Sequence, residues 1–386
     1  MKRLRAFTRK ATCNGTKNVF YMQLDVRNFF MSISKDILYE LIRAKCRDDN
    51  ILWLVKTIIF HDPTKDYLLK SPESLIRKIP RQKSLFDIEE NRGLPIGNLT
   101  SQFFANIYLN GLDQFVKHEL KCPYYVRYVD DFVLIHPEKE VLIGWHDKIV
   151  RYLYEKLRLN LKPEKIILPV KNGIDFLGYI IRPDYVLCRN RVVNNLKERL
   201  KNFAQKLVGV ENSIRTIRYD NEIPDELFAC LNSYLGHFGH ADTHRLIKSI
   251  FEKFPFLRYY FSHDNDGLKR LYLPPKRFPK MKNQYFHFLG KYHRSLIFFQ
   301  TGCFYEFYNA QAGLAVKALN LKRIKRKYGF RRRCGIGMKA LDRYVNIALK
   351  SGYSVVVINQ SGHRLRNLAL RKVSVQYIPI VESEQI

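Results

Sequence analysis

The stretch Tyr124–His136, YYVRYVDDFVLIH, constrains the fold more than any other part of the sequence. Two apolar and aromatic runs flank the adjacent acids Asp130 and Asp131, and aspartate is a poor strand residue that is costly to bury. No glycine or asparagine lies beside them, although tight hairpins favour Asn-Gly or Asp-Gly turns. The pattern predicts two strands that meet at an acidic end, either as an exposed hairpin tip or as a site where a cation offsets the charge.

Another acid follows a second strand-like run, because Asp25 ends the apolar segment NVFYMQLDV (18–26). Two strands that each deliver an aspartate to one end of a sheet offer the hard oxygen ligands that Mg²⁺ prefers. Two such ions would clamp the attacking 3′-hydroxyl and the leaving pyrophosphate of an in-line phosphoryl transfer. The alternative interpretation is a hairpin tip plus an unrelated N-cap aspartate.

The charge balance points to a polyanionic partner. The 386 residues contain 67 Lys and Arg against 36 Asp and Glu, a formal charge of +31, which favours nucleic-acid binding. The seven cysteines are scattered without a C-x-x-C pair, which indicates free thiols in a reducing compartment and argues against structural zinc. No apolar run is long enough to cross a membrane, so we expect a cytoplasmic protein without a membrane partner.

The length suits two domains, and the prolines and lysines of LYLPPKRFPKMKNQ (271–284) mark the boundary between them. We predict domains at 1–265 and 285–386 with a linker at 266–284. Mixed strands and helices before the boundary indicate an α+β fold, a small antiparallel sheet backed by helices. The elements expected are helices at 34–46, 101–120 and 140–159, a hairpin at 174–189, and then a strand at 294–308, helices at 309–321 and 338–352, and a strand at 353–360.

Several ordered motifs carry a family resemblance. YVDD (128–131) resembles the catalytic signature of reverse transcriptases, and Asp25 with its following aromatics resembles their first catalytic block. GLPIGNLTSQFFANIYLNGLDQF (93–115), LNLKPEK (159–165) and FLGY (176–179) are similar to the next blocks, in the right order. The resemblance covers about residues 1–250 and implies a right-hand polymerase palm with a helical thumb, and an RNA-directed DNA polymerase that uses template RNA, a DNA primer and dNTPs.

The resemblance also implies roles for individual residues. Asp25 and Asp130 would bind two Mg²⁺ ions, with Mn²⁺ as an alternative, helped by the Val26 carbonyl and flanked by Asp131. Lys165 would be the general acid that protonates pyrophosphate. Lys162 is a second candidate for this role, and the alternative is that Lys165 is a solvated side chain without a catalytic role. Phe30 would be the steric gate that selects dNTPs, although plain core packing explains one of Phe29 and Phe30.

The block at 93–115 narrows the type of polymerase. Ile96-Gly97 followed by Ser101-Gln102 resembles the variant in reverse transcriptases of diversity-generating retroelements, where most relatives carry Gln-Gly. An apolar Ile96 cannot hydrogen-bond near the templating base, and the resemblance implies error-prone copying of template adenines and a small basic accessory protein. The rivals are a group II intron-like or anti-phage defence reverse transcriptase, and a catalytically incompetent binding scaffold. The primer grip would be formed by Phe176, Leu177, Gly178 and Tyr179.

The resemblance leaves one gap. Relatives carry a fingers region ahead of the first catalytic aspartate, and only 24 residues precede Asp25, so we expect truncated fingers. Downstream, LNSYLGHFGHADTHRLIKSI (231–250) resembles the thumb helices, and its histidines fit helix packing or duplex contacts better than zinc.

The C-terminal part carries a second resemblance. FFQTGCFYEFYNAQAGLAVKALNL (298–321) is similar to the first, mismatch-recognising domain of MutS, a small α/β module. The resemblance implies that Phe304 inserts beside a mispaired base while Glu306 hydrogen-bonds it, although Cys303 stands where the family usually has Asp. The alternative is a module that kept the packing and lost the contact. The segment KRIKRKYGFRRR (322–333) would bind phosphates or form a solvated loop. The residues expected to contact nucleic acid are Lys322, Arg323, Lys325, Arg326, Arg331 and Arg332.

Overall fold

Two strands do meet at the acid pair, within the first of two compact units, Met1–Arg189 and Asn190–Ile386. The computed structural model describes residues 1–76, 78–80, 83–219, 222–264, 267–273, 278, 280–324, 329–365 and 368–380. In the first unit the antiparallel sheet order is β2-β3-β1-β4, beside a three-stranded sheet β5-β6-β7. The strands are β1 Phe20–Asp25, β2 Tyr125–Tyr128, β3 Asp131–His136, β4 Ile166–Pro169, β5 Ile174–Phe176, β6 Tyr179–Ile181 and β7 Val186–Cys188.

Helices fill most of the remaining first unit. They are α1 Lys2–Ala11, α2 Phe29–Ser32, α3 Lys35–Arg43, α4 Asp49–Phe60, α5 Glu73–Ile76, α6 Leu99–Tyr108, α7 Asn110–Gln114 and α8 Lys139–Leu157, with a π-helical turn at Phe115–Glu119 and 3₁₀ turns at Leu85–Asp87 and Val170–Asn172. Ser34 caps α3 by accepting a hydrogen bond from the Ile37 N–H, at the first residue of the helix expected at 34–46.

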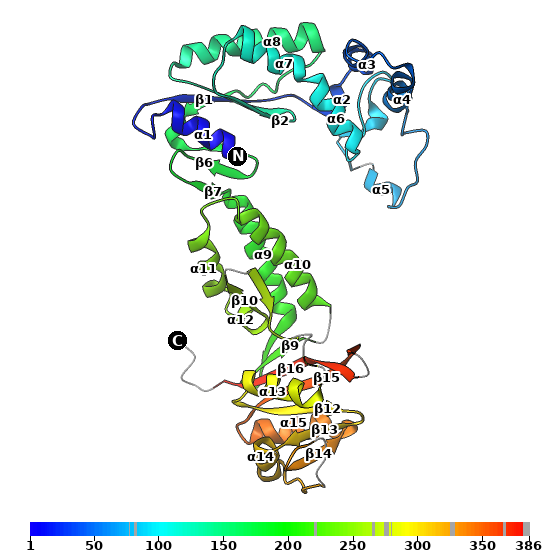
Figure 1. Ribbon diagram of the computed structural model, residues 1–386, viewed down its shortest axis with the longest axis vertical. Helices are drawn as coiled ribbons and strands as arrows, with labels where there is room; N and C mark the ends of the chain where they lie inside the picture. Colours follow the sequence, from blue (N-terminus) through cyan, green and yellow to red (C-terminus); the bar gives the residue numbers. More distant parts are fainter. Residues whose placement is uncertain are drawn as a thin grey trace. The chain divides into compact units, whose positions relative to one another are not determined.

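The alternation of side chains along β1 decides which face of the sheet is covered. Met22 and Leu24 are buried in one cluster with Phe132 of β3 and the apolar sides of α6, α7 and α8. Gln23 and Asp25 lie on the opposite face because strand side chains alternate with a period of two. Figure 1 shows α7 and α8 on one side of β1 and β2, and α1 with the β5–β7 sheet on the other. The acidic end therefore lies at the edge of a packed sheet, with its carboxylates away from the main helical layer.

The second unit is built on one seven-stranded sheet with the order β14-β13-β12-β15-β16-β9-β8. Its strands are β8 Val208–Glu211, β9 Ile214–Arg218, β12 Ser295–Thr301, β13 Phe304–Tyr308, β14 Arg333–Gly337, β15 Ser354–Leu365 and β16 Leu368–Pro379, and a separate hairpin joins β10 Phe261–Asp264 to β11 Gly267–Arg270. Its helices are α9 Asn190–Leu207, α10 Ile223–Phe238, α11 His244–Lys253, α12 Leu257–Tyr260, α13 Met281–Lys291, α14 Ala310–Leu319 and α15 Leu341–Lys350, with a 3₁₀ turn at Met338–Ala340.

Helices cover both faces of the C-terminal part of this sheet. Phe298 and Phe307 belong to the core that α14 and α15 close. On the other face, Tyr285 of α13 packs edge-on against Phe299 and Tyr308. β12 and β15 run parallel, with α14 and α15 in the connection between them, so the βαβ-like alternation read from the sequence is present.

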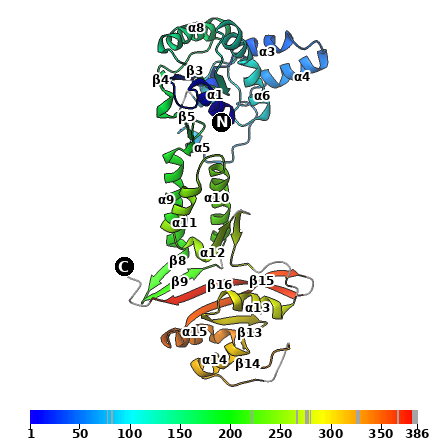
Figure 2. The same cartoon turned by 60° about the vertical axis from the view of Figure 1, so that its left-hand side comes forward.

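The compact units divide after Arg189 rather than within 266–284, where the sequence placed the linker. Residues 214–218 form β9, which pairs with Val375–Pro379 of β16 and so brings the region before the linker into the C-terminal sheet (Figure 2). The expected linker itself contains β11 and the start of α13. Local sequence could not indicate this because the two paired segments are separated by about 150 residues of chain.

Three predicted elements are subdivided. The helix at 101–120 breaks into α6, α7 and the π-helical turn, the strand at 294–308 is the hairpin β12–β13, and the hairpin at 174–189 has a third strand. Gly302, with φ +60°, supplies the extra turn in 294–308. Within the described residues, no helix has both the length and the apolar character needed to cross a membrane. The α+β class is confirmed.

Candidate active site and nucleic-acid interface

The turn between β2 and β3 is as short as a hairpin allows. Tyr128 and Asp131 are paired, which leaves Val129 and Asp130 as the two loop residues. Val129 has φ +55°, a conformation that a β-branched residue rarely adopts and that costs about 1–3 kcal/mol. This strained turn places Asp130 at the tip and Asp131 at the first position of β3. Backbone strain of this kind clusters at functional sites, so the turn itself marks the tip as a candidate.

Asp25 meets the tip from the neighbouring strand. It is the direct cross-strand partner of Asp131, and the Val26 N–H donates to the Asp130 carbonyl at 3.3 Å. Directly paired residues have Cβ atoms only about 5 Å apart. The three aspartates that the sequence singled out are thus brought together at one end of the sheet, with Val26 fixed beside them.

Lys162 is a cation that contacts Asp25 at this end of the sheet. Its Nζ lies 2.5 Å from Asp25 Oδ2, and its backbone N–H donates to the Asp25 carbonyl at 2.9 Å. The bond to Asp25 raises the pKa of the Lys162 ammonium. The other oxygen, Asp25 Oδ1, is buried and has no hydrogen-bond partner among the described residues. A buried, unpartnered carboxylate oxygen is costly unless a cation or donor reaches it.

The two hairpin carboxylates are electrostatically frustrated. Burial, and then the nearby Asp25 charge, raise the pKa of Asp130. Burial likewise raises the pKa of Asp131 to about 6, even though Gln23 Nε2 donates to its Oδ1 at 3.1 Å. Sequence reasoning missed Gln23, whose signal was a polar residue two positions before Asp25 in an otherwise apolar strand.

The donor chemistry fits a hard divalent cation. Clustered carboxylates with one orphaned oxygen are what Mg²⁺ favours, and a cation would relieve the repulsion that raises both pKa values. In the part of the chain that is described, no three His, Cys, Asp or Glu side chains already stand in a ligand arrangement. Lys162 at Asp25 Oδ2 therefore holds a position for which a bound cation would compete.

Lys165, the general acid expected from the resemblance, lies elsewhere. Its side chain is exposed, and its charge helps to lower the pKa of Asp147 on α8, after the larger effect of the hydrogen bond from His146. The structure therefore places Lys162, and not Lys165, in contact with the catalytic candidates.

The expected substrate-binding residues divide into buried and accessible ones. Phe29 is 2% exposed, whereas Phe30 beside it is half-buried and remains the candidate for contact with a nucleotide. Ile96 is 66% exposed and Gly97, with φ +103°, has open space around it. Gln102 is exposed while Ser101 is buried. Sequence reasoning missed Leu99 and Phe103, two exposed apolar residues four positions apart on α6.

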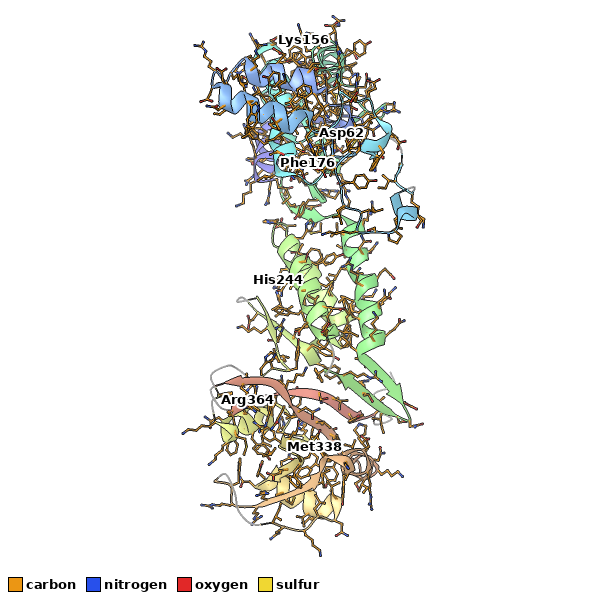
Figure 3. The ribbon with its side chains drawn as sticks, turned by 90° about the vertical axis from the view of Figure 1, so that its right-hand side faces the viewer. Asp62, Lys156, Phe176, His244, Met338 and Arg364 are labelled. Atoms are coloured by element: carbon orange, nitrogen blue, oxygen red, sulfur yellow. The ribbon has the colours of Figure 1, made fainter. Side chains whose placement is uncertain are left out.

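The proposed primer grip is a tight hairpin. Leu177 and Gly178, at φ +54° and +85°, form its turn, and two consecutive positive φ values match a type I′ geometry. The Gly178 carbonyl accepts from the Arg189 N–H at 2.9 Å. Phe176, labelled in Figure 3, and Tyr179 are buried. Only the Leu177–Gly178 turn is therefore open to a ligand, and the two aromatics anchor it.

Phe304 and Glu306 have different environments in the second unit. Phe304 is 54% exposed at the start of β13, whereas Glu306 is 3% exposed. Glu306 Oε1 is paired with Arg333 Nη2 at 2.8 Å, and its Oε2 accepts a hydrogen bond from the Tyr308 hydroxyl. The carboxylate that the resemblance assigns to base recognition is thus enclosed in an internal network.

The basic segment contributes surface charge where it is described. Lys322, Arg323, Arg331 and Arg332 are exposed, whereas Arg333 is turned inward to Glu306. Lys325 and Arg326 lie outside the described residues. Four exposed cations beside Phe304's sheet suit phosphate contacts.

Comparisons with known proteins match a different family to a part of each compact unit. Residues 2–181 match the family model described as reverse transcriptase (RNA-dependent DNA polymerase), and residues 279–379 match MutS domain I. Two separate parts of the chain thus match a reverse transcriptase model and a MutS domain I model. The four-stranded sheet with its helical layer is accordingly a polymerase palm, and Asp25, Asp130 and Asp131 all lie inside the reverse transcriptase match.

Individual relatives resemble parts of the chain. The DNA mismatch repair protein MSH7 of Arabidopsis thaliana is 36% identical over 95 residues, which are 24% of this chain and 9% of that protein. MSH6 of the same plant is 28% identical over 138 residues, 33% of this chain and 10% of its own length. The chain thus spans about a tenth of the curated relatives it matches.

Solved telomerase structures are similar at a lower level. Apo telomerase from Candida tropicalis is 14% identical with a TM-score of 0.37, covering 53% of this chain and 38% of that one. The same telomerase with a fragment of telomeric RNA is 15% identical with a TM-score of 0.33, covering 67% and 45%.

Replacing Asp131 with Asn tests the electrostatics of the hairpin. The folded state raises this pKa from 3.8 to about 6, so the folded protein binds more protons than the unfolded chain between these values. Stability should therefore fall as the pH rises from about 4 to about 6 and stay lower above. Without divalent cations, the melting temperature of D131N should be higher than that of the wild type at pH 7.5. At pH 4 the two melting temperatures should be equal. The exposed Asp66→Asn is the matched control, and a D131N melting point equal to wild type at pH 7.5 would refute the frustration.

Proposed function

We propose that this protein is an RNA-directed DNA polymerase that extends a DNA primer on template RNA by nucleotidyl transfer. The observation that carries the proposal is the meeting of Asp25 and Asp130 at one end of the palm sheet, with Asp25 Oδ1 buried and unpartnered, inside a reverse transcriptase domain. Its substrates are dNTPs and its partners are template RNA and the growing cDNA. Its basic composition supports polyanion binding.

Each carboxylate has a role in this proposal. Asp25 and Asp130, with the Val26 carbonyl, would hold two Mg²⁺ ions, or Mn²⁺ in their place. When bound, these ions supply electrostatic stabilisation of the attacking and leaving oxygens. Asp131, oriented by Gln23, supports the pair and adds negative charge. Phe30 would border the sugar of the incoming dNTP.

Lys162 is the better-placed of the two candidate proton donors. It already contacts Asp25 and its ammonium is held protonated by that contact, so it can deliver a proton to the leaving pyrophosphate once a cation releases it from Oδ2. Lys165 is exposed next to Asp147 instead. We therefore move the general-acid role from Lys165 to Lys162.

We further propose that the enzyme is the error-prone polymerase of a diversity-generating retroelement. The exposed, apolar Ile96 beside the open Gly97 supports this, because a base or template strand can approach without meeting a hydrogen-bonding side chain. The setting would be the cytoplasm, with a small basic accessory protein. The MutS-like domain would hold the RNA–DNA hybrid, or act where mismatched cDNA meets its target, through Phe304 and the exposed cations.

Primer extension on an RNA template tests the polymerase itself. The intact chain should extend a DNA primer with dNTPs and Mg²⁺. Asp130→Ala should lower the extension rate by more than about 100-fold, because losing even a residue that only hydrogen-bonds a metal ligand lowers activity by about 10- to 100-fold. Lys162→Gln should slow extension by about 100-fold or more, as loss of a general acid does, while the matched Lys165→Gln stays near wild type. No extension by the intact chain, with its accessory partner supplied, would favour a binding scaffold. Equal losses for the two lysine variants would contradict the reassignment.

Fidelity opposite template adenine tests the retroelement assignment. Ile96→Gln should lower misincorporation at adenines by about 10-fold, because one gained hydrogen bond of about 1.4 kcal/mol changes discrimination by that factor. Sequencing of cDNA products measures it, with Leu99→Gln, a substitution at another exposed apolar residue, as the control. Unchanged adenine errors in Ile96→Gln would point to a group II intron-like or defence enzyme.

Substitutions of Phe304 and Glu306 should have different effects on duplex binding. Phe304→Ala should lower the preference for mismatched over matched duplex, since its exposed ring can wedge at a weakened base step. Glu306→Gln should leave that preference unchanged and lower the melting temperature, because it removes a buried charge partner of Arg333. Competition binding and thermal melting measure both. The mismatch role is abandoned if Phe304→Ala leaves the affinity ratio intact.

A further inference from the structure

A groove lies in the second unit, outside the residues that either family model matches. It is bounded by α11 and by the β10–β11 hairpin and has a volume of about 560 Å³. Its helical wall is a single stripe, His244, Ile247, Lys248 and Phe251, spaced i, i+3, i+4 and i+7 along α11. Figure 3 labels His244, at the start of this stripe. The volume falls within the range of about 300–1,000 Å³ that small-ligand sites occupy.

The inner surface of the groove is aromatic and apolar. Phe261, 2% exposed, forms the base, and Ile247 and Leu271 line it further. The rings of Phe251 and His263 lie 6.0 Å apart with an interplanar angle of 34°. Phe251 is only half-buried, so one side of its ring still borders the open groove. A flat heterocycle entering there could stack on these rings.

The rim of the groove is cationic. Lys248 and Arg258 carry its positive charge, and the exposed His244 and His263 line the rim as polar groups. Among its described lining residues the one acid is Glu252, whose Oε1 lies 4.0 Å from Lys248 Nζ, the outer limit of an ion pair. An exposed pair at that distance contributes little, so the lysine remains available to an anion. The groove therefore combines an aromatic wall with a net positive rim.

We propose that this groove binds one unstacked nucleotide of a single-stranded nucleic acid. The base would lie against Phe251 and His263, and the adjoining phosphate would contact Lys248 and Arg258. A duplex is excluded as the occupant because its bases are already stacked on one another, and an acidic peptide would leave the aromatic wall unused. The site needs strand binding alone and no chemistry at Asp25 or Asp130. It would hold a single-stranded part of the template or cDNA.

Photocrosslinking locates the occupant. The full chain carrying Asp130→Ala, which keeps nucleic acid from being extended, is irradiated with single-stranded RNA containing 4-thiouridine and the adducts are mapped by mass spectrometry. We expect adducts on peptides that contain Phe251 or His263. Adducts confined to peptides outside 244–271 would overturn the proposal.

Binding of the same RNA then separates stacking from charge. Phe251→Leu keeps an apolar side chain but removes the ring, and should weaken single-strand binding by about 5- to 100-fold, the range of base–aromatic stacking, with duplex binding unchanged. Lys248→Gln should reduce the salt dependence by about 0.7 in log–log slope, the value for one single-strand phosphate. Arg245→Gln is the matched control, since Arg245 is exposed on the same helix and does not line the groove.

Three results would contradict the proposal. The first is equal weakening by Lys248→Gln and Arg245→Gln, which indicates diffuse charge attraction. The second is Phe251→Leu binding RNA as well as wild type while both retain the same melting temperature. The third is displacement of the RNA by poly-glutamate in preference to an abasic oligonucleotide competitor, which indicates a peptide groove.

Discussion

The register between β1 and β3 is the constraint on which the palm site depends. It sets Asp25 opposite Asp131, an arrangement that repulsion and burial oppose by at most about 3 kcal/mol, judged from the rise of the Asp131 pKa to about 6. The same register buries Met22, Leu24 and their β3 neighbours, each worth about 1.5–3 kcal/mol. A slip by one residue would turn these apolar side chains outward and Asp25 into the core. Hydrophobic packing therefore holds the carboxylates together, and the charge they retain is available to a cation.

The pairing of β9 with β16 plays the corresponding part in the second unit. It joins a segment that follows the long helix α9 to the last strand of the MutS-like domain, so the helical region and that domain share one sheet. Separating them would expose the backbone groups of five paired positions and the apolar side chains between them. The groove on α11 and the exposed Phe304 therefore belong to one compact unit, so the proposed single-strand binding and the proposed mismatch contact would belong to the same unit.

The sequence predicted those features whose causes are local. Alternating apolar residues and two acids without glycine were enough for the strands, the hairpin and the candidate carboxylates. The pairing of Ile214–Arg218 with the far end of the chain has no local signal, and neither does the choice between Lys162 and Lys165. These lysines are three positions apart, and the bridge between Val26 and Leu161 sets the neighbouring Lys162 beside Asp25. Long-range backbone pairing thus determines both the strand that Ile214–Arg218 joins and the lysine that contacts Asp25, neither of which motif spacing predicts.

Phe304 and Glu306 show why a shared strand face does not imply a shared function. A period of two places both side chains on one face of β13, but Glu306 lies about 7 Å further along, opposite Gly335 and within reach of Arg333. Freeing its carboxylate for a base would leave Arg333, whose side chain is 17% exposed, without this partner, at a cost of up to about 3–5 kcal/mol. A hydrogen bond from a charged group to a base returns about 1.5–3 kcal/mol. The internal pair is therefore the more stable arrangement, and on this face the exposed ring of Phe304 is left for the proposed recognition.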